Sequence, residues 1–410
     1  MSGLLILIAV GIAGILLFRW AGRRVEVWMN RIEGPIPGPA SERALRLHGE
    51  SLVVDLHADP LLWGRDLRER SRVGHVDLPR LREGGVALQV FGLVTQVPLG
   101  TTIERSDPSR LDTITLLALA GAWPWPALRS YLARARYQAG KLHALAAGAS
   151  GAFRVIRTRQ DLDALVAARR DGDSVVGGLL SVEGAQALDG KASNLVPLFE
   201  DGIRMIGLTH FFDNEFAGSA HGLSKGGLTA EGKTLVCEME RAGVVVDLAH
   251  ASAATIDDVL ALATRPVVVS HTGVRATCDS NRNLSDDQIR GVARGGGLIG
   301  IGFWSDAVGS THPADIARAA RHVVELVGDN HVALGSDFNG AVATSFDVSR
   351  LSVVTQALLD TGLPEGSVRK ALGENAVRVL RAVLPDAVSS ASPTASSISK
   401  GPFQEVPARG

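Results

Sequence analysis

The sequence predicts an α/β fold in which eight parallel strands close into a barrel surrounded by helices. Short apolar runs rich in β-branched residues recur through the middle of the 410-residue chain, and most are followed by a turn and a helical pattern. The runs are almost continuously apolar, which is typical of strands buried on both faces. Eight such runs within about 300 residues favour a (β/α)8 barrel of the TIM type over an open sheet.

The predicted strands are separated by turns and helical patterns. They cover Leu52–Leu56, Ala87–Val94, Val175–Val182, Arg204–Leu208, Val244–Leu248, Val267–Ser270, Leu298–Phe303 and Val332–Ser336. Amphipathic helices are expected between the later strands, over Thr229–Ala242, Ser252–Thr264, Ser285–Arg294 and Pro313–Val327. No glycine-rich phosphate-binding motif follows the first strand, which argues against a nucleotide-binding sheet.

The longest excursion from this alternation covers residues 105–147, after the second predicted strand. It has a largely helical pattern and contains Trp123-Pro124-Trp125-Pro126. The simplest interpretation is an extra helical hairpin packed on the barrel. A lid or a membrane-contacting element is the alternative, since long loops of this kind often carry function.

The composition excludes several classes of protein. The chain is 46% hydrophobic and 21% charged with a net charge of −1, so it is an ordinary globular protein without a basic field for nucleic acid. Its two cysteines are too few for a disulfide framework or a cysteine-rich zinc site. A metal would therefore be held mainly by His, Asp and Glu, and the chain has 11 histidines.

The N-terminal sequence predicts a membrane anchor. No charged side chain occurs from Met1 to Phe18, and residues 1–20 are adequate for a single membrane-spanning helix in a lipid bilayer. A cleaved signal peptide is the alternative, but no basic residue precedes the apolar run and no clear cleavage motif follows it. The arginines after the span favour a cytoplasmic domain.

The rest of the chain divides into three parts. Residues 21–40 are predicted to be a linker, stiffened by the sequence PIPGP. Residues 41–386 form the predicted barrel domain. Residues 387–410 lack apolar periodicity and are predicted to be a disordered tail.

Metal-binding side chains lie where the predicted strands end, which is the end of a (β/α)8 barrel that carries the chemistry. Five of them suit zinc or a related divalent ion: His57, Asp59, Glu183, His250 and His271. Because His57 and Asp59 are two residues apart, their side chains point to the same side of an extended segment. Glu183 can bridge two ions, which leaves His250 and His271 for the second ion.

Two further polar residues follow predicted strands, namely His210 and Asp337. Two divalent ions that share a water lower its pKa toward roughly 7 and polarise a carbonyl group. Asp337 could accept the proton of that water, and His210 could stabilise the oxyanion as it develops.

The remaining candidates have structural interpretations of at least equal weight. Asp55 and Asp247 precede His57 and His250 by two and three residues, and either orient these imidazoles or form capping and loop hydrogen bonds. The other histidines are expected on the surface or in packing contacts, with the weakest case for the one in a glycine-rich loop, His221; the set is His48, His75, His143, His221, His312, His322 and His331.

The chain resembles the membrane dipeptidase (renal dipeptidase) family of metallopeptidases over residues 52–380. The resemblance rests on separated motifs that occur in the same order. They are DLHAD at Asp55–Asp59, HVDLPRLREGGV at His75–Val86, SVEG at Ser181–Gly184, LTHFFDNEFAGS at Leu208–Ser219, VVDLAH at Val245–His250, SHTGVRATCDSNRNL at Ser270–Leu284, LGSDFNG at Leu334–Gly340 and GENAVRVL at Gly373–Leu380.

The resemblance implies a pair of zinc ions and a dipeptidase. The family holds its ions with an H-x-D pair, a bridging Glu and two later histidines, which fall on His57, Asp59, Glu183, His250 and His271. The implied reaction is hydrolysis of a dipeptide with a free C-terminal carboxylate by a metal-bridging hydroxide. Tolerance of a D-residue at the second position and a homodimer are further expectations from the family. Exported members of the family favour an extracytoplasmic domain, against the arginines that follow the predicted span, so the side of the membrane stays open.

The substrate contacts are implied in the same way. The family's substrate-contacting histidine falls on His210, and its acidic residue beside the bridging water falls on Asp337. The arginine that grips the substrate carboxylate falls on Arg282, in keeping with the bidentate geometry of guanidinium and carboxylate. The sequence departs from the family at Ala58, where Asn is common, and at Asn339, where Asp is common, and these departures bear on substrate range rather than on the metals.

Two other functions compete with this one. The first is an amidohydrolase that acts on N-acyl amino acids, lactams or lactones, but its usual pattern has H-x-H on the first strand, where this chain has His57-Ala58-Asp59. The second is a catalytically inactive, membrane-tethered binding protein. Such a protein should have lost metal ligands, and none of the five is missing.

Overall fold

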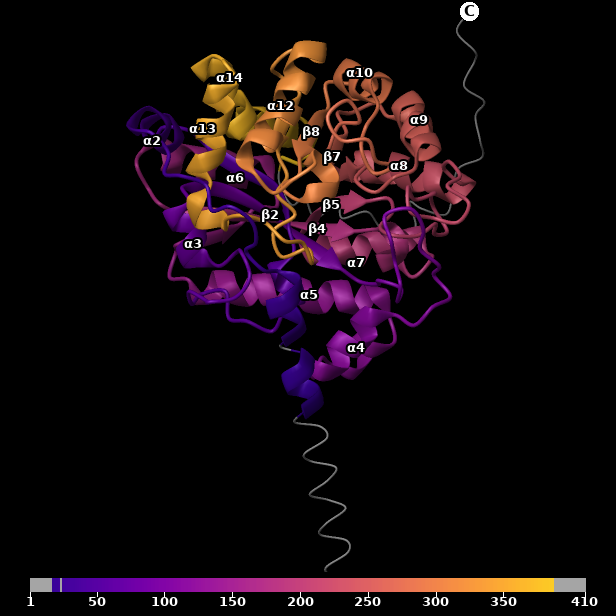
Figure 1. Cartoon of the computed structure of the whole chain (residues 1–410). Coiled ribbons are helices and arrows are strands. Elements are labelled where there is room, and N and C mark those ends of the chain that lie inside the picture. Colours follow the sequence, from indigo (N-terminus) through magenta and orange to yellow (C-terminus); the bar gives the residue numbers. More distant parts are fainter. Residues whose placement is uncertain (1–16, 23, 387–410) are drawn as a thin grey trace, which may run out of the picture.

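A closed parallel barrel forms the centre of the molecule. The computed structural model describes residues 17–22 and 24–386. Hydrogen-bonded neighbours follow the order β2-β1-β9-β8-β7-β6-β5-β4, and a further pairing of β2 with β4 closes the ring (Figure 1). The strands are β1 Val53–Ala58, β2 Val86–Val94, β4 Val176–Glu183, β5 Ile203–Gly207, β6 Val245–Asp247, β7 Val268–Thr272, β8 Leu298–Ile301 and β9 Val332–Leu334. This confirms the eight predicted strands.

One strand was not predicted from the sequence. β3 (Phe153–Val155) pairs in parallel with the first half of β4, on the side where β5 pairs with the second half. Only Phe153 of its three residues is buried, so no apolar run marks this strand. It lies outside the ring of eight and extends the sheet locally.

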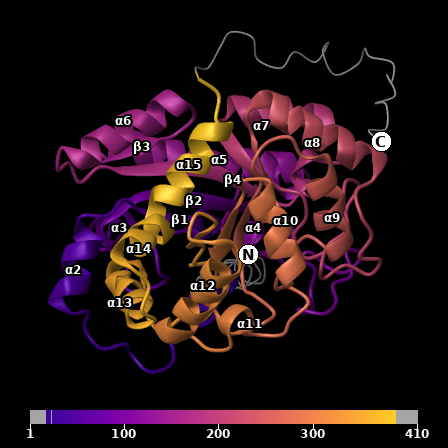
Figure 2. The ribbon, with the colours of Figure 1, turned by 90° about the horizontal axis from the view of Figure 1, so that it is seen from above.

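Helices surround the barrel, as the view from above shows (Figure 2). Those that follow or precede barrel strands are α2 Glu42–Gly49, α3 Leu78–Glu83, α6 Arg159–Arg170, α7 Leu195–Glu200, α8 Ala230–Ala242, α9 Ala253–Leu262, α10 Asp286–Arg294, α11 Ser305–Val308, α12 Pro313–Val327, α13 Ser352–Asp360, α14 Glu365–Arg369 and α15 Asn375–Val383. The predicted starts of three are N-caps: the side chains of Thr229, Ser252 and Ser285 accept hydrogen bonds from the first turns of α8, α9 and α10.

Each barrel strand is buried on both sides. In β1, Val53 belongs to the large apolar cluster that includes residues of α8, α10 and α12, whereas its neighbour Val54 belongs to a second cluster with residues of α6 and α15. Every residue of β1, β2 and β4 is buried. Polar side chains on these strands are therefore shielded from solvent.

The insertion after β2 is helical, as expected. It contains α4 (Thr113–Ala120), the short helix η2 (Trp125–Leu128) and α5 (Tyr131–Gly148). Buried side chains of α4 and η2 pack with Trp63 and Trp123 in a third apolar cluster. The insertion is thus fixed to the barrel rather than detached from it.

The N-terminal part bears on two predictions, the membrane span and the linker. No helix within residues 17–22 and 24–386 is long and apolar enough to cross a bilayer, and residues 1–16 of the predicted span lie outside the described residues. Residues 17–22 and 24–29 are helical, and Glu26, inside the predicted linker, is buried in an ion pair with Arg65. The amide of Glu33 donates to the carbonyl of Thr344 (2.7 Å), so this part of the linker is docked on the barrel. The predicted tail 387–410 also lies outside the described residues.

Candidate active site

The five predicted metal ligands converge at the carboxyl ends of the barrel strands. His57 lies near the end of β1 and His271 within β7, Glu183 is the last residue of β4, and Asp59 and His250 follow β1 and β6. All five are buried. Ligand atoms of His57, Asp59 and Glu183 lie close enough to hold one ion, and those of Glu183, His250 and His271 lie close enough to hold another.

Glu183 occupies the middle of this cluster. Its Oε1 lies 3.5 Å from Nε2 of His57, 3.0 Å from Nε2 of His250 and 3.4 Å from Nε2 of His271. Oδ1 of Asp59 lies 3.3 Å from Nε2 of His57. One oxygen of Glu183 therefore lies within 3.5 Å of three imidazoles, which come from β1, β7 and the segment after β6.

The donor atoms fit a divalent metal site. Among the described residues, Nε2 of His57 and Oδ1 of Asp59 are buried without a hydrogen-bond partner, which is rare for buried polar atoms. Nε2 of His250 and Nε2 of His271 face each other at 3.0 Å. Imidazole nitrogens and carboxylate oxygens at such spacing are the ligands that zinc and its neighbours prefer.

The electrostatics of the cluster call for added positive charge. Burial raises the pKa of Glu183 well above its usual value, and the nearby Asp59 and Asp337 raise it further. Burial by itself would lower the pKa of His57, but the carboxylates of Asp59, Glu183 and Asp337 outweigh it and raise this pKa to about 10. The three carboxylates lie together in a buried site, and bound divalent ions would compensate their negative charge.

The other two imidazoles are poised as neutral ligands. Burial holds the pKa of His250 and the pKa of His271 well below their usual values, with Arg282 adding to the effect in both cases. A neutral imidazole keeps a lone pair free for a metal, so neither residue needs to lose a proton before it binds one.

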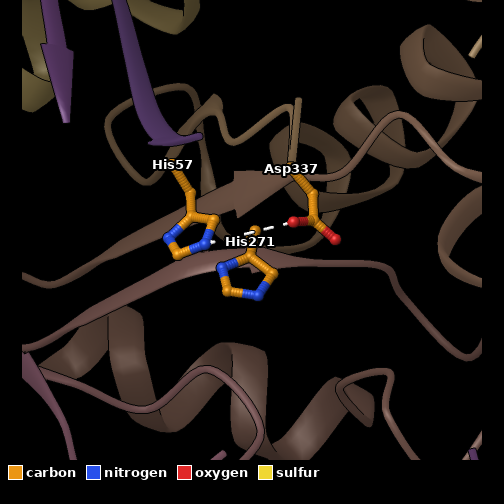
Figure 3. Close-up of side chains that lie close together, drawn as sticks. All are labelled: His57, His271 and Asp337. Atoms are coloured by element: carbon orange, nitrogen blue, oxygen red, sulfur yellow. Dashed lines mark ion pairs between the residues drawn. The ribbon is translucent and has the colours of Figure 1, made fainter. Parts of the chain in front are cut away.

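Two of the site residues have a left-handed backbone. His250 has φ 62° and Asp337 has φ 61°, a conformation that costs energy for a residue with a side chain. Hydrogen bonds hold both in place: the amide of Ala220 donates to the carbonyl of His250 (2.8 Å), and the amide of Asp337 donates to the carbonyl of His57 (3.1 Å). Figure 3 shows how the Asp337 carboxylate is thereby turned toward His57 and His271.

Two glycines, Gly92 and Gly340, leave space for the side chains of the site. A Cβ at Gly92, in the middle of β2, would lie 2.0 Å from Oδ1 of Asp59 and 2.8 Å from Cε1 of His57. A Cβ at Gly340 would lie 1.9 Å from Oδ1 of Asp337 and 2.9 Å from Oδ2 of Asp59. A glycine inside a strand often marks such a close approach, so Gly92 was detectable in the sequence.

The aspartates next to the strand ends divide into two roles. Asp55 accepts from the amide and hydroxyl of Ser336 and from the side chain of Gln89, so it joins the ends of β1 and β9 and does not touch the His57 ring. Asp247 accepts from the hydroxyl of Ser270 (2.6 Å), and the same hydroxyl lies 2.9 Å from Nδ1 of His271. Asp247 therefore orients His271, not His250 as the sequence spacing suggests.

His221 is the residue that the sequence reasoning missed. It is buried, and its Nε2 lies 3.1 Å from Nδ1 of His250. Burial and the charge of Arg282 lower the pKa of His221 to about 3, so the ring is neutral. Its Nε2 can then accept a hydrogen bond from the N–H of His250 Nδ1. This leaves Nε2 of His250 directed at Glu183. A histidine in a loop of glycines carried no periodic signal for this role.

The three predicted substrate residues border the same cluster. Nε2 of His210 lies 3.5 Å from Oε2 of Glu183, and Oδ1 of Asp337 lies 4.0 Å from Nε2 of His57. Arg282 is buried, and its Nη2 donates to the carbonyl of His271 (2.8 Å). No ion pair involves Arg282 within the described part of the chain.

A parallel barrel with carboxylates and imidazoles gathered at the carboxyl ends of its strands is the architecture of a metal-dependent hydrolase. The sequence pattern of the membrane dipeptidase family (Peptidase family M19) matches residues 41–393. The chain belongs to this family and is a metallo-dipeptidase with a divalent-metal site.

Individual relatives agree with this assignment. Dipeptidase verJ of Clonostachys rogersoniana is 28% identical over 327 residues, which cover 76% of this chain and 83% of the relative. The crystal structure of the dipeptidase AC, a metallopeptidase of family M19, is 27% identical with a TM-score of 0.66, over 82% of this chain and 100% of that one. A metallopeptidase from Rhodobacter sphaeroides, liganded with a phosphinate mimic of the dipeptide L-Ala-D-Ala, is 27% identical with a TM-score of 0.65, over 82% and 99%.

We expect Gly92→Ala to disrupt the metal site. The new methyl group would overlap Oδ1 of Asp59, which cannot retreat because the surrounding strands are fully buried. Bound metal, measured by elemental analysis of purified protein, should fall well below the wild-type content. Gly140→Ala is the matched control, because Gly140 lies in α5 with open space around its Cα, and this exchange should raise stability by about 0.5–1 kcal/mol. Equal metal content in both variants would contradict the steric argument.

We expect His221→Ala to weaken metal binding by roughly 10–100-fold, the usual cost of losing a group that orients a ligand. The reason is that Nδ1 of His250 would lose its only buried imidazole partner. A zinc titration against a competing chelator measures the effect. His322→Ala serves as control, since His322 pairs with Asp286 on the outside of the barrel (2.8 Å). An affinity equal to that of the control would show that His221 is merely a packing residue.

Proposed function

We propose that the protein holds two zinc ions, with Glu183 bridging them, and hydrolyses dipeptides that carry a free C-terminal carboxylate. The observation that carries the proposal is the position of Glu183 Oε1, within 3.5 Å of three imidazole nitrogens. His57 and Asp59 would complete the first ion's ligands, and His250 and His271 the second's. When bound, such a pair supplies Lewis acidity toward a carbonyl and activates water near neutral pH.

Asp337 is suited to move the proton in this reaction. Burial raises the pKa of its carboxyl group to about 8, while the opposing charges of His57 and Arg282 act to lower it. Bound cations would lower this pKa further, because positive charge favours the carboxylate. The carboxylate can then accept a proton from the attacking water and return it to the leaving amine.

His210 is suited to bind the carbonyl oxygen of the scissile amide. Burial, reinforced by His221 and His57, holds the pKa of His210 well below its usual value, so its ring is neutral and donates one N–H. The ring lies edge-on against that of His250 (4.7 Å between centroids), which fixes its direction. A fixed donor stabilises negative charge on the oxygen as it forms.

Arg282 would define the length of the substrate. Its guanidinium is charged although burial lowers its pKa to about 10, and the charges nearest to it include Asp337 and Glu183. A buried guanidinium binds a carboxylate through two parallel hydrogen bonds and sets its distance from the reacting amide. Only a peptide with a single residue after that amide would satisfy both sites.

We further propose that a D-residue is accepted at the second position. The relative from Rhodobacter sphaeroides binds a phosphinate mimic of L-Ala-D-Ala, and that relative covers 82% of this chain. The buried carboxylate clamp and the metal cluster would hold the C-terminal carboxylate and the amide of either stereoisomer. The preferred dipeptide and the predicted homodimer stay open.

For the N-terminus, we propose that residues 1–20 anchor the enzyme in a lipid bilayer. The support is the uncharged apolar sequence from Met1 to Phe18, which leads directly into the helical residues 17–22.

The metal content and the substrate class are tested together. We expect about two zinc ions per chain by elemental analysis, and loss of hydrolysis of L-Ala-L-Ala and L-Ala-D-Ala on chelation, restored by zinc. Glu183→Gln should lose metal and at least about 100-fold of the activity, because it removes the shared carboxylate. Glu231→Gln, at an exposed position of α8, should change neither. Full activity after chelation would refute the proposal, and one ion per chain would refute the pair.

The carboxylate clamp is tested by the substrate's C-terminus. Arg282→Ala should cost roughly 1.5–3 kcal/mol of binding, about 10- to 150-fold in kcat/KM, for free dipeptides. For C-terminally amidated dipeptides it should have little effect, because the carboxylate is already absent. Arg275→Ala, in the same loop but exposed, is the control. If both substrates suffer alike, Arg282 supports His271 and does not bind substrate.

A further inference from the structure

The outer surfaces of two elements far apart in the sequence form one apolar face. The first element is the N-terminal helix, residues 17–22 and 24–29, and the second is α4 with η2. They lie side by side at the lower end of the molecule in Figure 1. A Cβ at Gly22 would lie 2.6 Å from Cβ of Ala120, so the two helices touch at this point.

The inner side of the N-terminal helix is fixed to the protein. Gly22, Glu26, Met29 and Asn30 share one side of the helix and are buried or half-buried. Met29 packs on the same apolar cluster as Ile114 and other residues of α4 and η2. The amide of Ala341 donates to the side chain of Asn30 (2.9 Å). The helix is therefore held by one side, and its opposite side is left uncovered.

The outer side carries an unusual share of the exposed apolar side chains. Within the described residues, 15 large hydrophobic side chains are exposed, and nine of them lie on these two segments. Their exposed fractions run from 38% to 69%. They are Leu17, Phe18, Trp20, Val25, Val27, Trp28, Leu116, Leu119 and Trp125. A contiguous apolar face of this kind normally marks an interaction surface.

The charge pattern indicates what covers this face. Residues 113–128 contain no charged side chain, and the nearest acid, Asp112, is turned inward to pair with Arg134. Three arginines lie over tryptophan rings here: Arg24, on the outer side of the N-terminal helix, over Trp20 (5.2 Å), Arg31 over Trp28 (5.8 Å) and Arg129 over Trp125 (5.5 Å). Tryptophan rings and long cationic side chains that reach lipid headgroups are typical of the water–lipid interface.

The position of this face, directly after the apolar N-terminal sequence, favours a bilayer over a protein partner. The apolar face begins where the uncharged sequence from Met1 to Phe18 ends, so an anchor in these residues would bring the face to the membrane. We propose that α4 and η2, together with the outer side of the N-terminal helix, dip into the interfacial layer of an anionic lipid bilayer. The proposal rests on the anchor proposed above and adds a second, independent contact from the insertion after β2.

This contact would hold the barrel in one orientation on the membrane. The N-terminal helix is tied to the catalytic end of the barrel by the ion pair of Glu26 with Arg65 and by the pairing of Ile32 with Thr344. Thr344 lies in the loop that follows Asp337. A second contact at α4 would add to the anchor in fixing the end with the metal site relative to the bilayer.

The depth of single side chains in the bilayer tests the proposal. The full-length protein, with Cys237→Ser and Cys278→Ser, is reconstituted into vesicles of equal parts phosphatidylcholine and phosphatidylglycerol. A spin label is attached at Leu119→Cys in α4 or at Leu45→Cys in α2. These positions are matched, since both are leucines in eight-residue helices, 47% and 51% exposed, and neither lies in the metal site. Collision of the label with oxygen, which partitions into lipid, and with a water-soluble nickel chelate is measured by electron paramagnetic resonance.

We expect the label at 119 to favour oxygen severalfold over the nickel chelate and the label at 45 to favour the chelate. If both labels favour the chelate while the protein floats with the vesicles, the anchor holds and the contact through α4 is refuted. If the label at 119 is shielded from both reagents, protein covers the face, and the proposal is likewise refuted. If the protein does not float with the vesicles, both the anchor and the face are wrong. Dipeptide hydrolysis, assayed on the same samples, reports separately on the proposed enzymatic function.

Discussion

The rest of the structure depends on one constraint, the position of the Glu183 carboxylate among three imidazoles. A carboxylate at the end of a fully buried strand is costly unless positive charge or hydrogen-bond donors surround it. Here the surroundings are imidazoles from β1, β7 and the segment after β6, each within 3.5 Å of one oxygen. Only a closed barrel brings these strand ends to one point, and only a site that takes up cations makes the group of three carboxylates tolerable.

The residues around the cluster keep the ligands from relaxing into ordinary hydrogen bonds. Asp55 occupies the amide and hydroxyl of Ser336, and the hydroxyl of Ser270 stands between Asp247 and His271. Asp55 is thus engaged away from the His57 ring, whereas Ser270 holds the ring of His271. Among the described residues, Nε2 of His57 and Oδ1 of Asp59 remain buried and unpartnered, which is unfavourable for stability by itself and is the preorganisation that a metal site requires.

The sequence predicts the barrel well because its signals are local. Near-continuous apolar runs mark each barrel strand, and Ser and Thr caps mark the starts of α8, α9 and α10. β3 was not predicted because only one of its three residues is buried. The docking of residues 24–33 on the barrel was not predicted because their contacts, such as Glu26 with Arg65, join segments with no periodic relation in the sequence. A hydrogen bond between distant side chains leaves no trace in a single sequence.

The same limit explains which site residues could be found. Strand ends and the spacing in H-x-D point to ligands, whereas the groups that orient ligands come from other elements. Asp247 therefore appeared to serve His250, its neighbour in the sequence, but contacts the ring of His271 through Ser270 on the adjacent strand. His221 acts from a loop after β5, where nothing but the fold brings it to His250.

Asn339 shows how a departure from the family can be structural. Its Oδ1 accepts from the amides of His75 (3.0 Å) and Val76 (2.9 Å), and its backbone carbonyl accepts from the indole of Trp63 (2.8 Å). Through its Oδ1, the side chain fastens the segment before α3 to the loop after β9. An aspartate could accept the same two bonds, but it would place a further negative charge two residues from Asp337, beside a cluster that already holds three carboxylates. The neutral amide keeps the fastening and avoids that repulsion, so this departure has a structural reason.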